Sequence, residues 1–424
     1  MIGKNLKNLL RSLKRFLRPR NYNYLILFAV CNLHAALIII EPNDNSYESI
    51  QEALLLAKPG DTVRLTGGTF YLEDSLSLDV PDVKIEGEGM DVSILEFSNQ
   101  KSGAQGLLVA SDNVTLQDFS VLNAKGDAIK AKGVKNISFI RVKTEWSGGP
   151  KSTNGAYGLY PVESENVLID GCVAIGASDA GIYVGQSKNI IVKNSWAKEN
   201  VAGIEIENSY YADVFNNTAT ENTGGILVFD LPDLPQQGGH DVRVFNNKIV
   251  GNNTDNFAPE GNIVGEVPSG TGIIIMANSN IEIFNNEIVD NGTVGIAVVS
   301  YSDEHEDENY YPHPRRVQIH NNIFKNNGRN PDYETNEMGK ILYDISSGKM
   351  ADIFWDGVVP FSQILFGQPR DERMIISGQD NDAFITINPI KFMLNLDNVV
   401  IKDISKFKGA INSLPPVQLN ESSI

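Results

Sequence analysis

The chain has 424 residues, 42% of them hydrophobic, and a formal net charge of −18 at pH 7. The first 36 residues contain seven of the 35 basic residues and no acidic residue, so the remainder is more acidic still. This charge argues against nucleic acid or an anionic membrane as the main partner. It also argues against a polyanionic substrate, unless a local basic patch or a bound cation reverses the sign.

The N-terminal segment has the pattern of a secretory signal peptide. A basic region is followed by the apolar run Tyr24–Ala36, which ends in small residues. We therefore predict a signal peptide over residues 1–36 and a periplasmic or secreted protein. The alternative is an uncleaved anchor, which would then be the only attachment to a membrane. The apolar run continues to Ile40 and is at the short limit for a membrane span, so we assign residues 37–40 to the first strand of the fold.

A short amphipathic helix is predicted next. Asn45 and Glu48 have the spacing of a helix start, and Pro59-Gly60 ends the segment. Four apolar residues share one face of this helix: Ile50, Ala53, Leu54 and Ala57. We expect the helix to cap the first coil of the following repeat, whose core would otherwise face water.

A repeat of about 22 residues then dominates the sequence. Eight small residues are each followed by apolar residues one and three places later, which is the alternation of a β-strand. A strand repeated at this period predicts an all-β stack of coils, a parallel β-helix, over residues 37–345. The small residues are Gly106, Ala128, Gly158, Gly181, Gly203, Gly225, Gly272 and Gly295.

Pairs of asparagines confirm the period. They follow strand-like segments at 216–217, 246–247, 285–286 and 321–322, with a further asparagine five residues after each pair. Asparagine tolerates the left-handed conformation of a sharp corner, and stacked amides bond from coil to coil, so we predict structural ladders. Four insertions interrupt the repeat, at about 144–156, 230–241, 253–271 and 300–316. The repeat fades after residue 345, and residues 346–424 are predicted to be a C-terminal cap or appendage.

The side chains two and four positions after each small residue should point outward, and the polar ones among them define a candidate site. Polar outward residues are confined to the middle coils, where Tyr157 lies beside them and Trp146 and the 144–156 loop should form a wall. Aromatic faces stack on sugars, lysine neutralises carboxylates, and Tyr or Glu moves protons. We assign catalysis to Tyr157, Lys130 and Glu205, and substrate binding to Lys132, Trp146, Tyr160, Tyr183 and Glu207. The alternative is that these are ordinary outward residues of an exposed sheet.

No cofactor is expected. The histidines His240, His305, His313 and His320 lack the spacing of metal ligands. A calcium ion could be considered at the acidic run 303–308, but this run lacks the glycine turn and spaced ligands of a calcium loop. A solvated charge run explains it better.

The segment Gly-Asp-Thr-Val-Arg-Leu at 60–65 with Gly-Thr-Phe at 68–70, the coil length and the asparagine ladder resemble the right-handed parallel β-helix superfamily. This pectin-lyase-like group includes pectate lyases, alginate C5-epimerases and periplasmic copper-accessory proteins. The resemblance covers residues 37 to about 330 and implies a right-handed, single-stranded parallel β-helix.

One segment resembles the epimerase motif Y-G-F-D-P-H-E/D more closely. Residues 156–163 read Ala-Tyr-Gly-Leu-Tyr-Pro-Val-Glu, so Tyr157 falls on the family's catalytic tyrosine. Tyr160 and Val162 stand where the family has its aspartate and histidine, and Val201 lies near the position of its arginine. Three of the four functional residues implied by the resemblance are therefore replaced.

The sequence thus predicts an exported β-helix protein that binds a polysaccharide or glycan in a groove over residues 130–207. A uronan C5-epimerase or lyase that uses Tyr157, with Lys130 or Lys132 facing the substrate carboxylate, is one alternative. A non-enzymatic envelope scaffold, adhesin or accessory protein for a periplasmic metalloenzyme is the other.

Overall fold

The computed structural model describes residues 35–379, 383–394 and 396–419. The predicted signal peptide lies outside the described residues, apart from its last two positions. Residues from Ala35 onward belong to one compact unit. No helix within the described ranges combines the length and apolar character that a membrane crossing requires.

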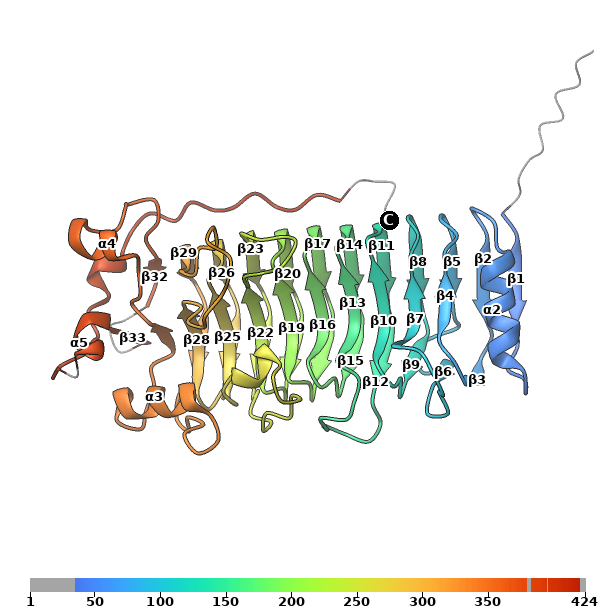
Figure 1. Ribbon diagram of the computed structural model, residues 1–424, viewed down its shortest axis with the longest axis horizontal. Helices are drawn as coiled ribbons and strands as arrows, with labels where there is room; N and C mark the ends of the chain where they lie inside the picture. The colour runs from blue at the N-terminus through green and yellow to red at the C-terminus, as the bar shows by residue number, and fades with distance from the viewer. Residues whose placement is uncertain (1–34, 380–382, 395, 420–424) are drawn as a thin grey trace, which may run out of the picture. The chain divides into compact units, whose positions relative to one another are not determined.

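Three parallel sheets run along this unit, and each full coil contributes one strand to each sheet in the order A, B, C (Figure 1). Sheet A contains β1 (Leu37–Ile40), β2 (Thr62–Leu65), β5 (Lys84–Glu86), β8 (Val114–Gln117), β11 (Lys135–Ile140), β14 (Glu165–Asp170), β17 (Lys188–Lys193), β20 (Tyr210–Phe215), β23 (His240–Phe245), β26 (Ser279–Phe284), β29 (Arg315–His320) and β32 (Ile375–Ser377). Sheet B contains β3 (Gly68–Tyr71), β6 (Ser93–Glu96), β9 (Ser120–Leu122), β12 (Lys143–Glu145), β15 (Val173–Ile175), β18 (Trp196–Lys198), β21 (Thr218–Thr220), β24 (Lys248–Val250), β27 (Glu287–Val289) and β30 (Ile323–Lys325).

Sheet C holds the strands that contain the small residues of the repeat. It contains β4 (Leu76–Leu78), β7 (Gln105–Val109), β10 (Asp127–Lys132), β13 (Tyr157–Val162), β16 (Ala180–Gly185), β19 (Ala202–Glu207), β22 (Gly224–Phe229), β25 (Thr271–Met276), β28 (Val294–Val299), β31 (Ile353–Trp355), β33 (Phe384–Ile387) and the antiparallel β34 (Val400–Ile401). The predicted all-β parallel β-helix is confirmed.

The small residues are required by the closeness of successive coils. A Cβ atom at Gly158 would lie 2.4 Å from the carbonyl oxygen of Gly181, and one at Gly225 would lie 2.6 Å from that of Gly272. The residues one and three places later are buried at every repeat, as predicted. They form the continuous apolar core between the three sheets.

The asparagine ladders are also confirmed, and the two adjacent asparagines of a pair have different structural roles. Asn246 adopts a left-handed backbone with φ 55°, whereas Asn247 is buried and bonds to the coils on both sides. The Asn247 amide nitrogen donates to Oδ1 of Asn286 over 3.0 Å, and Asn247 Oδ1 accepts from the Asn217 amide over 3.1 Å. A second buried ladder runs through positions 200, 222, 252, 291 and 327 at the corner between sheets B and C.

Each end of the stack is covered by other elements. The predicted helix is α2 (Ser46–Leu56), and Ile50 and Leu54 on its inner face are buried against the first coils. Asn45 precedes it, although its side chain makes no capping bond. At the other end, β31, β32 and β33 continue sheets A and C beyond residue 345, so the repeat geometry outlasts its sequence signal. The remaining helices are η1 (Ile263–Glu266), α3 (Glu337–Ser346), α4 (Phe361–Phe366), α5 (Pro389–Met393) and η3 (Ile404–Phe407).

Candidate functional site

The insertions mark sheet C as the enclosed face of the molecule. The connections β12–β13 and β24–β25 enter sheet C, and β22–β23 and β28–β29 leave it, and these four carry the predicted insertions. Every connection from sheet A to sheet B between β8 and β30 is only two residues long. Loops grafted onto a rigid stack commonly carry binding function, so sheet C is where a site is expected.

Three tyrosines pack together on the outward face of sheet C. Tyr157 and Tyr160 lie on β13, and Tyr183 lies on the adjacent β16. The centre of the Tyr157 ring lies 4.3 Å from that of Tyr160 and 4.6 Å from that of Tyr183. The ring centres of Tyr160 and Tyr183 are 5.0 Å apart. The packing depends on Gly185, because a Cβ atom there would lie 2.2 Å from the Tyr183 hydroxyl.

Three carboxyl groups adjoin the tyrosines: Asp179, Glu205 and Glu207. The Tyr183 hydroxyl donates a 2.6 Å hydrogen bond to Glu207. Burial raises the pKa of Glu207 to about 7, against that hydrogen bond, and burial together with Glu207 raises the pKa of Asp179 to about 7. The pKa of Glu205 is raised by burial and by both neighbours. With pKa values raised this far, the carboxyl groups of Asp179 and Glu207 retain protons near neutral pH and can donate as well as accept hydrogen bonds.

The accessible rim of this cluster is formed by Lys130 and Asp127 on β10. Their side chains are 25% and 13% exposed and lie 3.7 Å apart, and Lys130 Nζ lies 4.4 Å from the centre of the Tyr160 ring. Burial raises the pKa of Asp127 to about 6, against the opposing effect of Lys130. Lys132 is exposed and pairs with Glu163 over 3.5 Å. Both lysines therefore already face a carboxylate of the chain itself.

The structure brings together six of the eight residues predicted for the site, but not in the expected environment. We expected an exposed patch, yet Tyr183, Glu205 and Glu207 are buried, and Glu205 Oε2 has no hydrogen-bond partner among the described residues. The insertion after β24 covers them: Val264 and Val267 pack in the same apolar cluster as Tyr183. Catalysis by Glu205 would require this cover to open.

Trp146 does not form a wall of the site, which corrects that prediction. Its side chain is 5% exposed, belongs to the interior core and donates from Nε1 to the carbonyl oxygen of Ala124 over 2.7 Å. Gly155 leaves room for the indole, because a Cβ atom at this position would lie 2.5 Å from the indole ring. Lys132 is not part of the tyrosine cluster, because its side chain is 55% exposed and pairs with Glu163.

The apolar outward residues of the later coils are covered by several segments of the chain. Leu231 and Tyr310, from the insertions at 230–241 and 300–316, pack there. Val264 from the insertion before β25 and Leu342 from α3 pack there as well. The Tyr310 hydroxyl donates to the carbonyl oxygen of Asp230, which joins two of the insertions.

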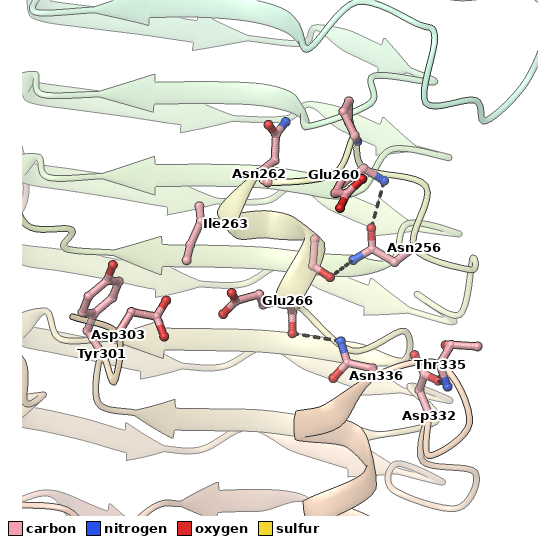
Figure 2. Close-up of a pocket in the computed structure, with 14 residues that line it drawn as sticks. Asn256, Glu260, Asn262, Ile263, Glu266, Tyr301, Asp303, Asp332, Thr335 and Asn336 are labelled. Atoms are coloured by element: carbon pink, nitrogen blue, oxygen red, sulfur yellow. Dashed lines mark hydrogen bonds between the residues drawn. The ribbon is translucent and has the colours of Figure 1, made fainter. Parts of the chain in front are cut away.

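A polar cavity of about 590 Å³ adjoins the cluster (Figure 2). Asn262, on its lining, donates to Asp179 over 3.0 Å and so connects cavity and cluster. The lining offers carboxylates, amides, a hydroxyl and the Tyr301 ring, and includes no lysine or arginine. Burial, followed by Asp303 and Glu337, raises the pKa of Glu266 in this lining.

Sequence reasoning missed Asp127, Asp179 and Asn262. The first two had a signal, since they stand one and two places before a small residue of the repeat. Asn262 had none, because its insertion has no period. Within the described part of the chain, no group of three or more His, Cys, Asp or Glu side chains is arranged to hold a metal ion.

Comparison with known proteins places the chain in a class. The profile of the right-handed β-helix region matches residues 83–233 and 235–340, which is more than half of the sequence. The chain therefore belongs to the right-handed β-helix family. Comparison with curated protein sequences gave no match.

Several solved structures are similar at low identity. The A-module of mannuronan C-5 epimerase AlgE4 from Azotobacter vinelandii is 16% identical with a TM-score of 0.47, over 73% of this chain and 87% of that one. An alginate lyase from Paenibacillus sp. FPU-7 is 16% identical with a TM-score of 0.47, over 68% and 95%. The tailspike of E. coli bacteriophage HK620 is 12% identical with a TM-score of 0.49, over 76% and 58%. At these values the similarities assign no function.

Proposed function

We propose that this protein binds a glycan on the outward face of sheet C, across the rim formed by Lys130, Asp127 and Tyr160 and into the adjoining cavity. The observation that carries the proposal is the continuity of the tyrosine–carboxyl cluster with this cavity through Asn262 and Asp179. Amphipathic rings with nearby amides and carboxyls offer the mixture of apolar contact and hydrogen bonding that sugar hydroxyls need. The cavity volume is in the range of small-ligand sites.

The charge of the surroundings favours an uncharged or amino sugar over a uronate. Lys130 and Lys132 are already paired with Asp127 and Glu163. The other ionisable groups of the cluster and of the cavity lining are acids or tyrosines. A substrate carboxylate placed here would meet like charge without a free cation, which is unfavourable in a partly buried site.

The same geometry gives less support to a uronan epimerase or lyase. Proton abstraction by Tyr157 would require an accessible tyrosinate, whereas burial and the neighbouring carboxyls raise the pKa of Tyr157 above its ordinary value. Lys130 lies against Asp127 and the Tyr160 ring, so it is not free to neutralise a substrate carboxylate.

Titration calorimetry with matched oligosaccharides tests the proposal. A neutral β-glucan or a chitosan oligomer should bind more tightly than an alginate oligomer of equal length. Tyr160→Ala and Asn262→Ala should each weaken the best ligand about tenfold, the loss of roughly one aromatic or polar contact. The matched control is Tyr71→Ala, which removes an exposed tyrosine of sheet B and should leave binding unchanged.

Binding that is unaffected by both site variants would refute this location. Tightest binding of the alginate oligomer, or an unsaturated product or an epimerised sugar detected by absorbance and proton NMR, would refute the charge argument and favour the enzyme. Absence of binding to every glycan would favour the scaffold alternative.

We also propose, from the sequence of residues 1–36, that the protein acts outside the cytoplasm. Expression of the full chain in a Gram-negative host followed by mass spectrometry of the purified product tests this. A mature N-terminus near residue 37 supports export with cleavage, and an intact N-terminus in the soluble cytoplasmic fraction contradicts it.

A further inference from the structure

Several polar side chains on the outer face of sheet A are buried, although side chains on an outer face are expected to contact water. Strand alternation directs Asp213, Glu282 and Gln318 away from the core, because their neighbours on both sides along each strand point inward. These three side chains are nevertheless 3%, 1% and 7% exposed. After η3 the chain runs back over the strands of sheet A and covers them (Figure 1).

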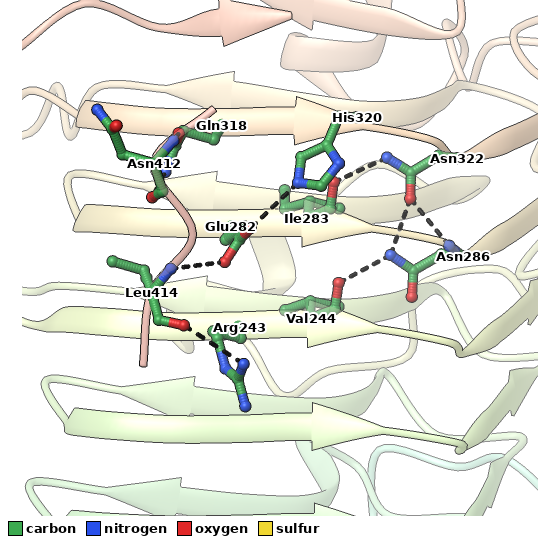
Figure 3. A network of polar contacts seen from close by, with 10 residues as sticks. All are labelled: Arg243, Val244, Glu282, Ile283, Asn286, Gln318, His320, Asn322, Asn412 and Leu414. Atoms are coloured by element: carbon green, nitrogen blue, oxygen red, sulfur yellow. Dashed lines mark hydrogen bonds and ion pairs between the residues drawn. The ribbon is translucent and has the colours of Figure 1, made fainter. Parts of the chain in front are cut away.

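The covering segment is bound through its backbone (Figure 3). Gln318 Nε2 donates to the carbonyl oxygen of Asn412 over 2.7 Å, and Gln318 Oε1 accepts from the Asn412 amide over 2.6 Å. The Leu414 amide donates to Glu282 over 2.9 Å, and its carbonyl oxygen accepts from Arg243 over 3.4 Å. A polar side chain on each of β29, β26 and β23 thus binds the backbone of the tail.

The next strand continues the pattern. The Val417 amide donates to Asp213 on β20 over 3.1 Å. Pro415 and Pro416, which have no amide hydrogen, lie between the two donors, and they line a cavity of about 220 Å³ together with Tyr211. A proline pair facing an exposed aromatic ring is a common way of binding extended, preformed peptide.

The spacing of the tail fits the spacing of the strands. Three steps from β29 to β20 span about 14 Å. The five steps from Asn412 to Val417 span about 16 Å at the rise of a polyproline II helix. An extended segment of this length is therefore long enough for its backbone groups to reach β29, β26, β23 and β20 in turn.

The charged side chains of this row across sheet A also depend on the contact with the tail. Asp213 forms an ion pair with Arg243 at 2.7 Å, and Glu282 lies 3.1 Å from His320. Buried carboxylates are costly unless all their oxygens are satisfied, and here tail amides provide the remaining donors. The row is therefore complementary to an extended backbone rather than to water.

We propose that the row Asp213, Arg243, Glu282 and Gln318 is a peptide-binding site, and that residues 411–418 of the chain are its resident ligand. Because the bonds go to backbone groups, the site selects an extended segment by the position of its amide hydrogens and prolines. Its occupation ties β20, β23, β26 and β29 together across coils. The site lies on sheet A, so the proposal is independent of glycan binding on sheet C.

The test uses the full chain with Leu414→Pro and Val417→Pro, which removes two of the three donor amides. We expect this variant to bind a labelled peptide of residues 410–419, measured by fluorescence anisotropy, at least tenfold more tightly than the unmodified protein does. Its own tail should be cleaved by a protease at least tenfold faster. Ser413→Ala in the full chain is the control for a change in the tail that keeps every amide.

Two further comparisons separate specific binding from general loosening. Adding Gln318→Ala to the double-proline variant should weaken peptide binding about tenfold, whereas adding Thr218→Ala, on sheet B, should not change it. A peptide that itself contains both prolines should bind at least tenfold more weakly than the natural peptide. Equal binding by the variant and the unmodified protein, no binding by either, or loss of binding with Thr218→Ala overturns the proposal.

Discussion

Adjacent asparagines at one corner should differ greatly in their contribution to stability, and Asn246 and Asn247 provide the sharpest comparison. Asn247→Ala removes the amide that donates to Val214 and Asn286 and the oxygen that accepts twice from Asn217. Each bond contributes about 1 kcal/mol net, and the groups left behind are buried, so we expect a loss of about 4 kcal/mol. Asn246→Ala keeps the ladder and adds only the cost of a left-handed alanine, about 1 kcal/mol.

Urea denaturation followed by circular dichroism measures both values, with fluorescence as a second probe because a stack of coils need not unfold in one step. The slope of the transition must be unchanged for the two free energies to be compared. Asn246→Gly is the matched control, because glycine adopts the left-handed backbone freely and should cost least. Equal losses for Asn246→Ala and Asn247→Ala, or a loss below about 1 kcal/mol for the latter, would refute the assignment of separate roles.

Three further predictions follow from the cluster, the small-residue column and the buried indole. Asp179 and Glu207 have folded pKa values of about 7, above those of an unfolded chain, so the folded state binds more protons between about pH 4 and pH 7. Their contribution is fully present below that window and is lost as the pH rises through 7, so the thermal midpoint should be lower at pH 8 than at pH 5. Gly225→Ala should destabilise the chain by several kcal/mol in urea, because its Cβ would meet the Gly272 carbonyl. Trp146→Phe should cost about 1 kcal/mol and leave glycan affinity unchanged in calorimetry.

Each of these has a decisive counter-result. A double variant Asp179→Asn and Glu207→Gln that keeps the full pH dependence would show that other groups cause it. Gly225→Ala at wild-type stability would mean that the coils move apart freely. A large loss of glycan affinity in Trp146→Phe, at unchanged stability, would restore the predicted wall.

The fold was predictable because each coil repeats the same physical requirement. A carbonyl of the next coil passes most of the small residues, and each buried ladder asparagine has a partner one coil away, so the pattern recurs in sequence. The end of the stack was less predictable. β31 and β33 satisfy the same pairing without the small residue and alternation of the earlier coils, since they lie near a covered end.

For the candidate site, the sequence predicted which side chains are neighbours on adjacent strands, but not that they are buried. The pairing of Lys130 with Tyr160 and of Tyr183 with Glu205 follows directly from the period. Whether those side chains meet water depends on the insertion before β25, whose path is set by individual contacts such as that of Asn262 with Asp179. The inward turn of Trp146 likewise depends on Gly155, a loop glycine outside the repeat, so the repeat pattern does not reveal it.

The corners of the coil differ in how much added chain they can accept. The two-residue turns between sheets A and B, bonded coil to coil through residues such as Asn217 and Asn247, leave no space for added chain. Both edges of sheet C accept segments of ten residues or more without interrupting a strand. A lineage of such proteins could therefore exchange the loops around one face while inheriting the backbone of the stack intact, and a designer could graft recognition loops at the same four places.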